Sequence, residues 1–187
     1  MSAASSAGRF DLLFVCTGNI CRSPTAQHIA AARLPADRFR VHSAGTYGLH
    51  GYPIEPKAGT LLANEGFACD AFRARRLDPA MVAAAHLILT ATREHRTAVV
   101  TMVPNALPKT FTIREFARLT EHVPPVEAED LVAAAAAQRG RVWVPPEHDD
   151  IADPYGQNAV AYERAYREIY EALARPLALL AGTTVDT

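Results

Sequence analysis

The segment FVCTGNICRSPTAQ, residues 14–27, constrains the fold more than any other part of this chain of 187 residues. It overlaps a short apolar run at residues 11–15, which is typical of a buried strand. A helix is expected after the turn, with Ser23 as its N-cap and Pro24 at its first position, where a missing N–H loses no helical partner. A second strand at residues 39–45 then completes a right-handed parallel βαβ unit.

The alternation of strands and helices continues along the chain. Further strands are expected at residues 86–91 and 109–113, and further helices at residues 55–65, 78–85, 92–102 and 114–119. This order predicts an α/β fold with a single domain. We expect a doubly wound parallel sheet of about four strands, flanked by helices.

Some segments lie outside this regular alternation. Residues 1–8 and 183–187 are expected to be flexible tails around one domain at residues 9–182. Residues from about 120 to 148 form an inserted segment, in which proline-rich connectors flank an alanine-rich stretch. We expect a surface helix in this insertion, and the alternative is a linker. The final expected helix, residues 158–180, carries a core-facing stripe at helical spacing: Tyr162, Tyr166, Ile169, Tyr170 and Leu173.

Composition argues against several classes of protein. A formal net charge of −1 does not suit a nucleic-acid-binding protein, which needs a basic surface. No apolar run is long enough to span a membrane, and the first residues lack the features of a signal peptide, so we expect a cytoplasmic protein. Three cysteines, an odd number, do not suit a secreted disulfide framework. No metal or cofactor is expected, because His148, Asp149 and Asp150 are adjacent and the other histidines are scattered.

Cys16 and Arg22 enclose five residues in the turn between the first strand and the first helix. Successive backbone N–H groups in such a turn converge on one point, and the helix N-terminus adds partial positive charge. Arg22 adds a full charge in a fork that matches two phosphate oxygens. Gly18 and Asn19 tolerate the left-handed backbone that a tight loop requires. The sequence therefore predicts a phosphate-binding loop directly after the first strand.

The same positive field favours the thiolate form of Cys16, which is a nucleophile. Its attack on a bound phosphate monoester would give a cysteinyl-phosphate, which water then hydrolyses. The leaving oxygen needs a proton from a carboxylic acid on another loop. Asp153 is the preferred candidate because Asp153-Pro154 precedes a Tyr-Gly turn, and Asp150 is the second. Asp78 precedes a proline and a helix, which is typical of an N-cap.

Three motifs together resemble the low-molecular-weight protein tyrosine phosphatases. They are VCTGNICRSP at residues 15–24, SAGT at 43–46 and DPYG at 153–156, and the resemblance spans nearly the whole chain. The Cys-x5-Arg pattern alone recurs on unrelated folds, whereas the full loop near the N-terminus with a distant Asp-Pro is specific. The resemblance implies that Cys16 is the nucleophile, Arg22 the phosphate clamp and Asp153 the general acid. It further implies a phosphate-binding loop with its support made of Thr17, Gly18, Asn19, Ile20, Cys21, Ser23 and Ser43.

Individual roles follow from this resemblance. Ser23 is expected to hydrogen-bond the Cys16 thiolate, while Asn19 and Ser43 hold the loop in shape. Cys21 is expected either to form a reversible disulfide with Cys16, which guards the nucleophile, or to be a small buried side chain.

The resemblance also bears on the substrate. Ile20 stands where the arginine-phosphatase branch of the family has threonine, and an apolar residue there suits phosphotyrosine. Tyr155 and Tyr47 are expected to flank an aromatic substrate. Phe72 stands where the family usually has a histidine that supports the loop, so that support is expected to be missing.

Two alternative functions share these residues. An arsenate reductase of the same fold needs a relay of further thiols, and only Cys69 lies downstream of the loop. A non-catalytic phosphoprotein-binding module would be expected to lack the nucleophile or the acid. The preferred prediction is a phosphotyrosine phosphatase that acts on a protein substrate, with inorganic phosphate as product or inhibitor. Bacterial relatives often oppose a tyrosine kinase, so such a kinase is the expected partner.

Overall fold

The computed structural model describes residues 8–141 and 144–182. Apart from Gly8, the two expected tails at residues 1–8 and 183–187 lie outside the described residues.

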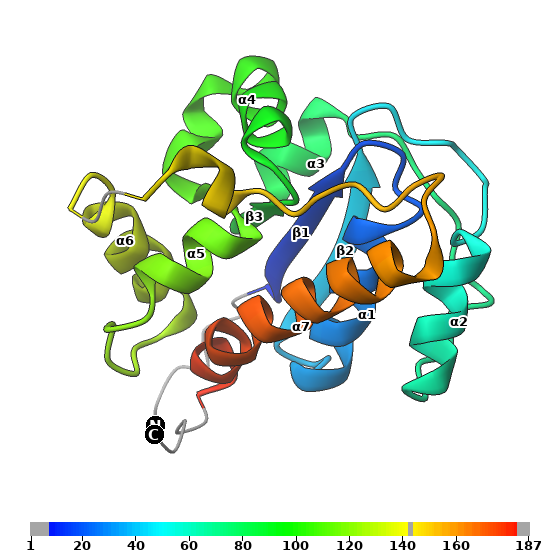
Figure 1. The fold of residues 1–187 in the computed structure, drawn as a ribbon. Helices are drawn as coiled ribbons and strands as arrows, with labels where there is room; N and C mark the ends of the chain where they lie inside the picture. The colour runs from blue at the N-terminus through cyan, green and yellow to red at the C-terminus, as the bar shows by residue number, and fades with distance from the viewer. Residues whose placement is uncertain (1–7, 142–143, 183–187) are drawn as a thin grey trace.

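Four parallel strands form the sheet at the centre of the molecule (Figure 1). They are β1 (Phe10–Cys16), β2 (Phe39–Gly45), β3 (Leu87–Thr90) and β4 (Thr110–Thr112), in the spatial order β2-β1-β3-β4. β1 pairs with β2 along its whole length and with β3 on its other side, and every residue of β1 is buried. The predicted four-stranded parallel sheet is therefore confirmed.

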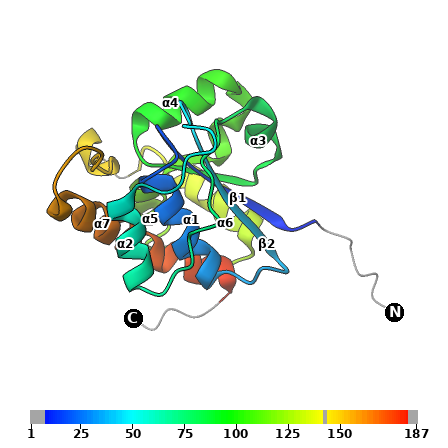
Figure 2. The same cartoon turned by 90° about the vertical axis from the view of Figure 1, so that its right-hand side faces the viewer.

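Helices cover both faces of the sheet. In chain order they are α1 (Arg22–Arg33), α2 (Pro56–Asn64), α3 (Pro79–Ala84), α4 (Arg93–Met102), α5 (Ile113–Leu119), α6 (Ala128–Gln138) and α7 (Ala159–Ala181), with the short 3-10 helices η1 (Pro104–Lys109) and η2 (Pro146–Asp149). Leu12 and Phe14 of β1 belong to the core with α1, α5, α6 and α7. Leu13 and Val15 face the opposite side and pack with residues of α3 and α4. Figure 2 shows α3 and α4 on one side of β1 and β2, with α1, α5 and α7 on the other. The alternation of side chains along one buried strand thus builds two cores.

The start of α1 differs from the prediction. The N-cap position is Cys21, without a side-chain cap, and Ser23 lies inside the first turn of the helix. Pro24 is therefore the third helical residue and not the first. Ser23 cannot cap the helix because its hydroxyl lies against Cys16 and Asn19. The first N–H groups of α1 remain directed at the turn.

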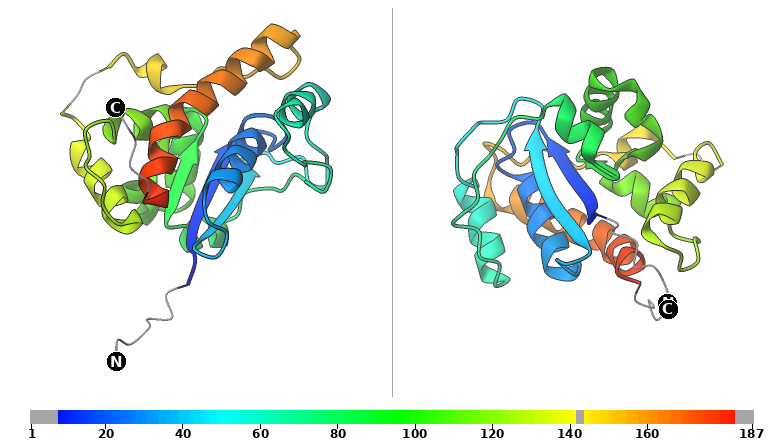
Figure 3. Two further views of the ribbon diagram at one scale, coloured as in Figure 1. Left: turned by 90° about the horizontal axis from the view of Figure 1, so that it is seen from below. Right: turned by 180° about the vertical axis from the view of Figure 1, so that it is seen from behind.

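The inserted segment contains the expected helix, α6, but the prediction that it lies on the surface is wrong for one face. Leu131 and Ala135 are fully buried, in the same core as α5 and α7. Beyond the helix, Arg139 forms an ion pair with the buried Glu115 and stacks on the Phe111 ring. α6 and α2 lie at opposite sides of the molecule (Figure 3). The alanine-rich sequence does not indicate which face is buried, because the small alanine side chains suit close packing against neighbouring helices as well as a surface position.

The stripe on α7 is confirmed in part. Tyr162, Ile169 and Leu173 are buried, and Tyr166 is half-buried. Tyr170 is exposed, against the prediction, and its ring lies under the Arg33 guanidinium at 4.2 Å. Within the described residues, no helix combines the length and apolar character needed to cross a membrane.

Candidate functional site

The candidate site lies at the carboxyl end of the central strand. Cys16 is the last residue of β1, and the turn that follows leads directly into α1. β1 has β2 on one side and β3 on the other. The chain goes from β1 to β2 on one side and later returns to β3 on the other, so the direction of the connections reverses at the end of β1. In doubly wound sheets this is the point where ligands bind.

Asn19 holds the turn in its conformation. It is fully buried, and its backbone is left-handed with a φ of 56°. Its Nδ2 donates to Ser23 Oγ at 2.9 Å and to Ser43 Oγ at 2.8 Å, while its Oδ1 accepts the Arg75 backbone N–H at 2.9 Å. Asn19 and Ser43 are therefore joined directly by a hydrogen bond behind the turn. Of the two residues expected to tolerate a left-handed backbone, Asn19 is the one that adopts it.

Ser23 connects this network to the thiol. Ser23 Oγ lies 3.0 Å from Cys16 Sγ, and both residues are buried. Ser23 Oγ accepts a hydrogen from Asn19, and its own hydroxyl hydrogen has two acceptors within reach, the Cys16 sulfur and the Ala44 carbonyl oxygen at 3.4 Å. A chain of contacts therefore runs from Arg75 through Asn19 and Ser23 to Cys16.

Arg22 joins the turn to the loop that carries Asp153. Its guanidinium donates to Asp153 Oδ2 at 2.7 Å and to the Ile151 carbonyl at 3.0 Å. The Arg22 side chain is 4% exposed and that of Asp153 49% exposed, so the carboxylate stands at the edge of solvent. Of the other acidic residues in this segment, Asp150 pairs with Arg93, on the first turn of α4. Asp153 is thus the carboxylate that faces the thiol-bearing turn.

An open pocket of about 350 Å³ lies over the turn. Its lining comprises Cys16, Thr17, Gly18, Ile20, Cys21, Arg22, Tyr47, Leu49, Asp153 and Tyr155. Tyr47 and Tyr155 are 73% and 61% exposed, so their rings form the rim. The structure therefore brings nearly all of the predicted site residues together here, while Asn19, Ser23 and Ser43 lie behind the turn.

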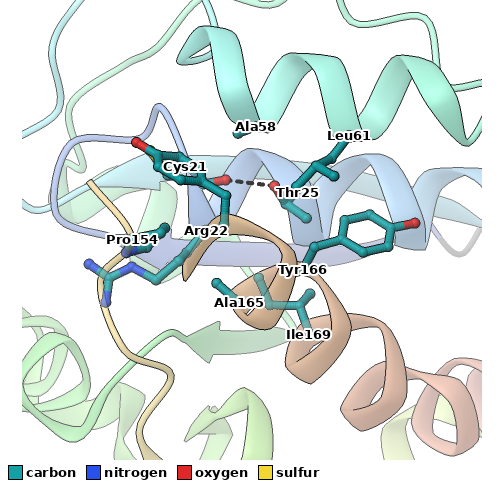
Figure 4. Close-up of a pocket in the computed structure, with 10 residues that line it drawn as sticks. Cys21, Arg22, Thr25, Ala58, Leu61, Pro154, Ala165, Tyr166 and Ile169 are labelled. Carbon is teal, nitrogen blue, oxygen red and sulfur yellow. Dashed lines mark hydrogen bonds between the residues drawn. The ribbon is translucent and has the colours of Figure 1, made fainter. Parts of the chain in front are cut away.

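Cys21 faces a second, much smaller cavity behind the turn (Figure 4). This cavity measures about 10 Å³ and is lined by residues of α2, α7 and the start of α1, so it has room for about one water molecule at most. In Figure 4 the Arg22 guanidinium extends past Pro154, away from α2. Burial and then the neighbouring Cys16 raise the pKa of the Cys21 thiol to about 12. Cys21 is therefore a protonated thiol near neutral pH.

Several residues of the site escaped the sequence analysis. Leu49 completes the apolar wall, and Arg75 supports the turn through its backbone N–H and through Nε, which donates to the Ser43 carbonyl at 2.8 Å. His95 lies under the turn, with Nε2 2.8 Å from Thr17 Oγ1. None of these residues carries a local sequence signal, because each acts through a contact with a distant segment. Phe72, which stands in place of the expected histidine, packs beside His28. The support of the turn comes from Arg75 and not from the side chain at position 72.

Two of the three residues considered for a metal site, His148, Asp149 and Asp150, form ion pairs with different arginines. Asp149 pairs with Arg118, and Asp150 pairs with Arg93. Across residues 8–141 and 144–182, no three His, Cys, Asp or Glu side chains are grouped so that they could hold a metal ion.

Comparisons with known proteins match most of the chain. The family model described as "Low molecular weight phosphotyrosine protein phosphatase" matches residues 11–127. The low molecular weight protein-tyrosine-phosphatase Etp of Escherichia coli (strain K12) is 30% identical over 83% of this chain and 84% of its own length. A protein-arginine-phosphatase of Geobacillus stearothermophilus is 31% identical over 90% of this chain and 94% of its own. The structure of Vibrio vulnificus Wzb in complex with benzylphosphonate has a TM-score of 0.68 at 26% identity, covering 91% of this chain and 98% of that one.

Proposed function

Because this chain belongs to the low molecular weight phosphotyrosine protein phosphatase family, we propose that it hydrolyses phosphotyrosine monoesters through a cysteinyl-phosphate intermediate. One observation carries the proposal: a buried thiol, an arginine and a carboxylate from a distant loop converge on a single open pocket. Cys16 lies at the floor of that pocket, and Arg22 and Asp153 form its charged side. An oxyanion is the ligand that such a turn at a helix N-terminus favours.

The first step uses Cys16 as nucleophile. The phosphoryl oxygens bind the N–H groups of the turn and the Arg22 fork, which aligns phosphorus over the sulfur. The hydroxyl of Ser23 stabilises the thiolate before attack, at a distance of 3.0 Å. The S–P bond forms as the P–O bond to tyrosine breaks, and Asp153 gives its proton to the leaving phenolic oxygen.

The second step reverses the role of Asp153. Its carboxylate takes a proton from a water molecule, whose oxygen attacks phosphorus and breaks the S–P bond. Inorganic phosphate leaves and the thiolate is restored. The ion pair between Arg22 and Asp153 belongs to the free enzyme, and phosphoryl oxygens replace the carboxylate as partners of Arg22 when substrate binds. This exchange frees the Asp153 carboxylate, which takes up a proton from solvent before it acts as the acid for the leaving group.

The walls of the pocket support an aromatic substrate. Ile20, Leu49, Tyr47 and Tyr155 present apolar and aromatic surface around the thiol, and ring faces prefer such neighbours. The Wzb relative was solved with benzylphosphonate, an aromatic phosphonate. A relative of similar identity is named a protein-arginine-phosphatase, yet Ile20 offers no polar group to a guanidinium. Phosphotyrosine is therefore the preferred substrate.

The two alternative functions find less support. Cys69, the third cysteine, is not part of the pocket lining, and its Sγ lies beside the Gly59 carbonyl. A thiol relay for arsenate reduction would need further cysteines at the pocket. A phosphoprotein-binding module would not need Cys16 and Asp153 together in one pocket. We further propose that the protein acts in the cytoplasm on proteins phosphorylated by a tyrosine kinase.

The test is hydrolysis of an aryl phosphate, a phosphotyrosine peptide and a phosphoarginine peptide, in reducing buffer with a chelator. The wild type is compared with Cys16→Ser and with Cys69→Ser as a matched control. We expect activity on the aryl phosphate and the phosphotyrosine peptide that Cys16→Ser abolishes and Cys69→Ser retains. Activity that survives Cys16→Ser would refute the covalent route. A preference for the phosphoarginine peptide would refute the assigned substrate.

A further inference from the structure

His95 connects the cap of α4 to the wall of the pocket. It is 6% exposed and lies in the first turn of α4, which begins beside the thiol-bearing turn. Its Nε2 lies 2.8 Å from Thr17 Oγ1, and its Nδ1 lies 2.8 Å from Thr92 Oγ1. Thr17 follows Cys16 directly and lines the pocket. Three side chains therefore form a continuous path from the helix cap to the substrate-facing surface.

The hydrogen-bond partners of the His95 imidazole determine which of its two nitrogens carries the hydrogen. A neutral imidazole has one N–H and one acceptor nitrogen. Thr92 Oγ1 already accepts the backbone N–H of His95 as the cap of the helix, so its hydroxyl hydrogen is available to Nδ1. Nε2 then carries the hydrogen and donates it to Thr17 Oγ1. The opposite tautomer would make Thr92 Oγ1 accept twice and would turn its hydroxyl hydrogen away from the imidazole.

The surroundings keep the imidazole neutral. Burial is the largest effect and Arg22 the second, and together they lower the pKa of His95 to about 4. The carboxylates of Asp153 and Asp150 face it from the acid-bearing loop and act in the opposite direction. Near pH 7 the residue therefore has one donor and one acceptor.

We propose that His95 is a positioning residue of the phosphatase: its Nε2–H fixes the oxygen of Thr17, so that the Thr17 hydroxyl hydrogen points into the pocket and donates to an oxygen of the bound phosphoryl group. The inference rests on the proposed function, since it assigns Thr17 to the same pocket as Cys16. In the described part of the chain, His95 is the side chain that contacts Thr17 Oγ1, which leaves that hydroxyl hydrogen to a ligand.

The tautomer can be tested without turnover. Long-range 1H–15N spectra of protein labelled with 15N-histidine distinguish Nε2–H, Nδ1–H and doubly protonated rings. The signal that disappears in His95→Gln identifies the residue. We expect the Nε2–H tautomer at pH 7. An Nδ1–H or a doubly protonated ring would overturn the inference, whatever the activity of the enzyme.

Kinetics test the consequence for substrate. The amide nitrogen of His95→Gln reaches the place of Nε2 and can still donate to Thr17, whereas that of His95→Asn reaches only the place of Nδ1. We expect His95→Gln to retain kcat/KM within about twofold, and His95→Asn and Thr17→Val to lose about three- to tenfold, the effect of one hydrogen bond. The double variant Thr17→Val/His95→Asn should lose no more than Thr17→Val alone.

Two results would contradict this assignment. Equal losses in His95→Gln and His95→Asn that follow their melting temperatures would indicate a purely structural histidine. Wild-type kcat/KM in Thr17→Val would show that its hydroxyl does not reach the substrate. If the wild type hydrolyses none of the substrates, the proposed function fails separately. The affinity of Thr17→Val for inorganic phosphate then decides, and unchanged affinity overturns the inference.

Discussion

Replacing Asn19 tests how the turn over the thiol is held. The side chain makes three hydrogen bonds in a fully buried position, to Ser23, to Ser43 and to the backbone N–H of Arg75. Its backbone φ is 56°, a conformation that alanine adopts at a cost and glycine adopts freely. Asn19→Ala removes the hydrogen bonds and adds strain. Asn19→Gly removes the same hydrogen bonds without the strain.

The structure gives the size of the effect. Three hydrogen bonds at about 1 kcal/mol each predict a loss of roughly 3 kcal/mol in the free energy of unfolding for either variant. The left-handed backbone adds about 1 kcal/mol for Asn19→Ala. Both variants should also lose kcat/KM, because Ser23 is no longer oriented toward Cys16 and the N–H groups of the turn no longer converge.

Equilibrium unfolding in urea, followed by circular dichroism, measures these differences. Asp78→Ala is the matched control, since Asp78 caps α3 at an exposed site away from the pocket. It should lose about 1 kcal/mol and keep its activity. A loss below about 1 kcal/mol in both Asn19 variants would refute the hydrogen-bond account. Equal stability of Asn19→Ala and Asn19→Gly would refute the argument from backbone strain.

Further predictions concern the acid, the insertion and the effect of pH. Asp153→Asn should lower kcat on phosphotyrosine by about 100- to 10,000-fold. The loss should be much smaller on an aryl phosphate with a more acidic phenol, and equal losses would contradict its role as general acid. Arg139→Met should lower the free energy of unfolding by about 2 kcal/mol, because it removes a charged hydrogen bond to the buried Glu115, which keeps its ion pair with Arg96. Its kcat/KM should stay at the wild-type value, and a loss of activity would show that the insertion acts on the site. The unfolded chain binds a proton at His95 near the ordinary pKa of 6.5 and the folded protein only near 4, so stability falls as pH drops between these values. In His95→Gln the slope of urea stability against pH should be smaller by about one proton, and an unchanged slope would contradict the lowered pKa.

Local residues were enough to predict much of the fold and of the site. The apolar run of β1, the Gly/Asn turn and the helix after it lie within one continuous segment, so their order alone predicts the strand–turn–helix unit. The spacing of Cys16 and Arg22 within that turn predicts an oxyanion-binding site. Asp153 is the preferred candidate for the acid because an Asp-Pro before a Tyr-Gly turn differs locally from Asp78-Pro79, where Asp78 caps a helix.

Other features depend on which distant segments meet. Asn19, and not Gly18, has the left-handed backbone, because the Asn19 side chain hydrogen-bonds to Ser43 and to the backbone N–H of Arg75. The buried face of α6 exists because α5 and α7 pack against it, and an alanine-rich sequence is equally compatible with a surface helix. His95 belongs to the site because the first turn of α4 lies next to Thr17.

The division follows the range of the interactions. Strand, turn and helix preferences act between residues a few positions apart, so the sequence by itself determined the strands of the sheet and the turn that joins β1 to α1. Hydrogen-bond partners, burial and the pKa of His95 depend on atoms brought together by packing from separate elements. Only the tertiary structure could decide them, because the same local sequence permits many such neighbours and the folded core selects one.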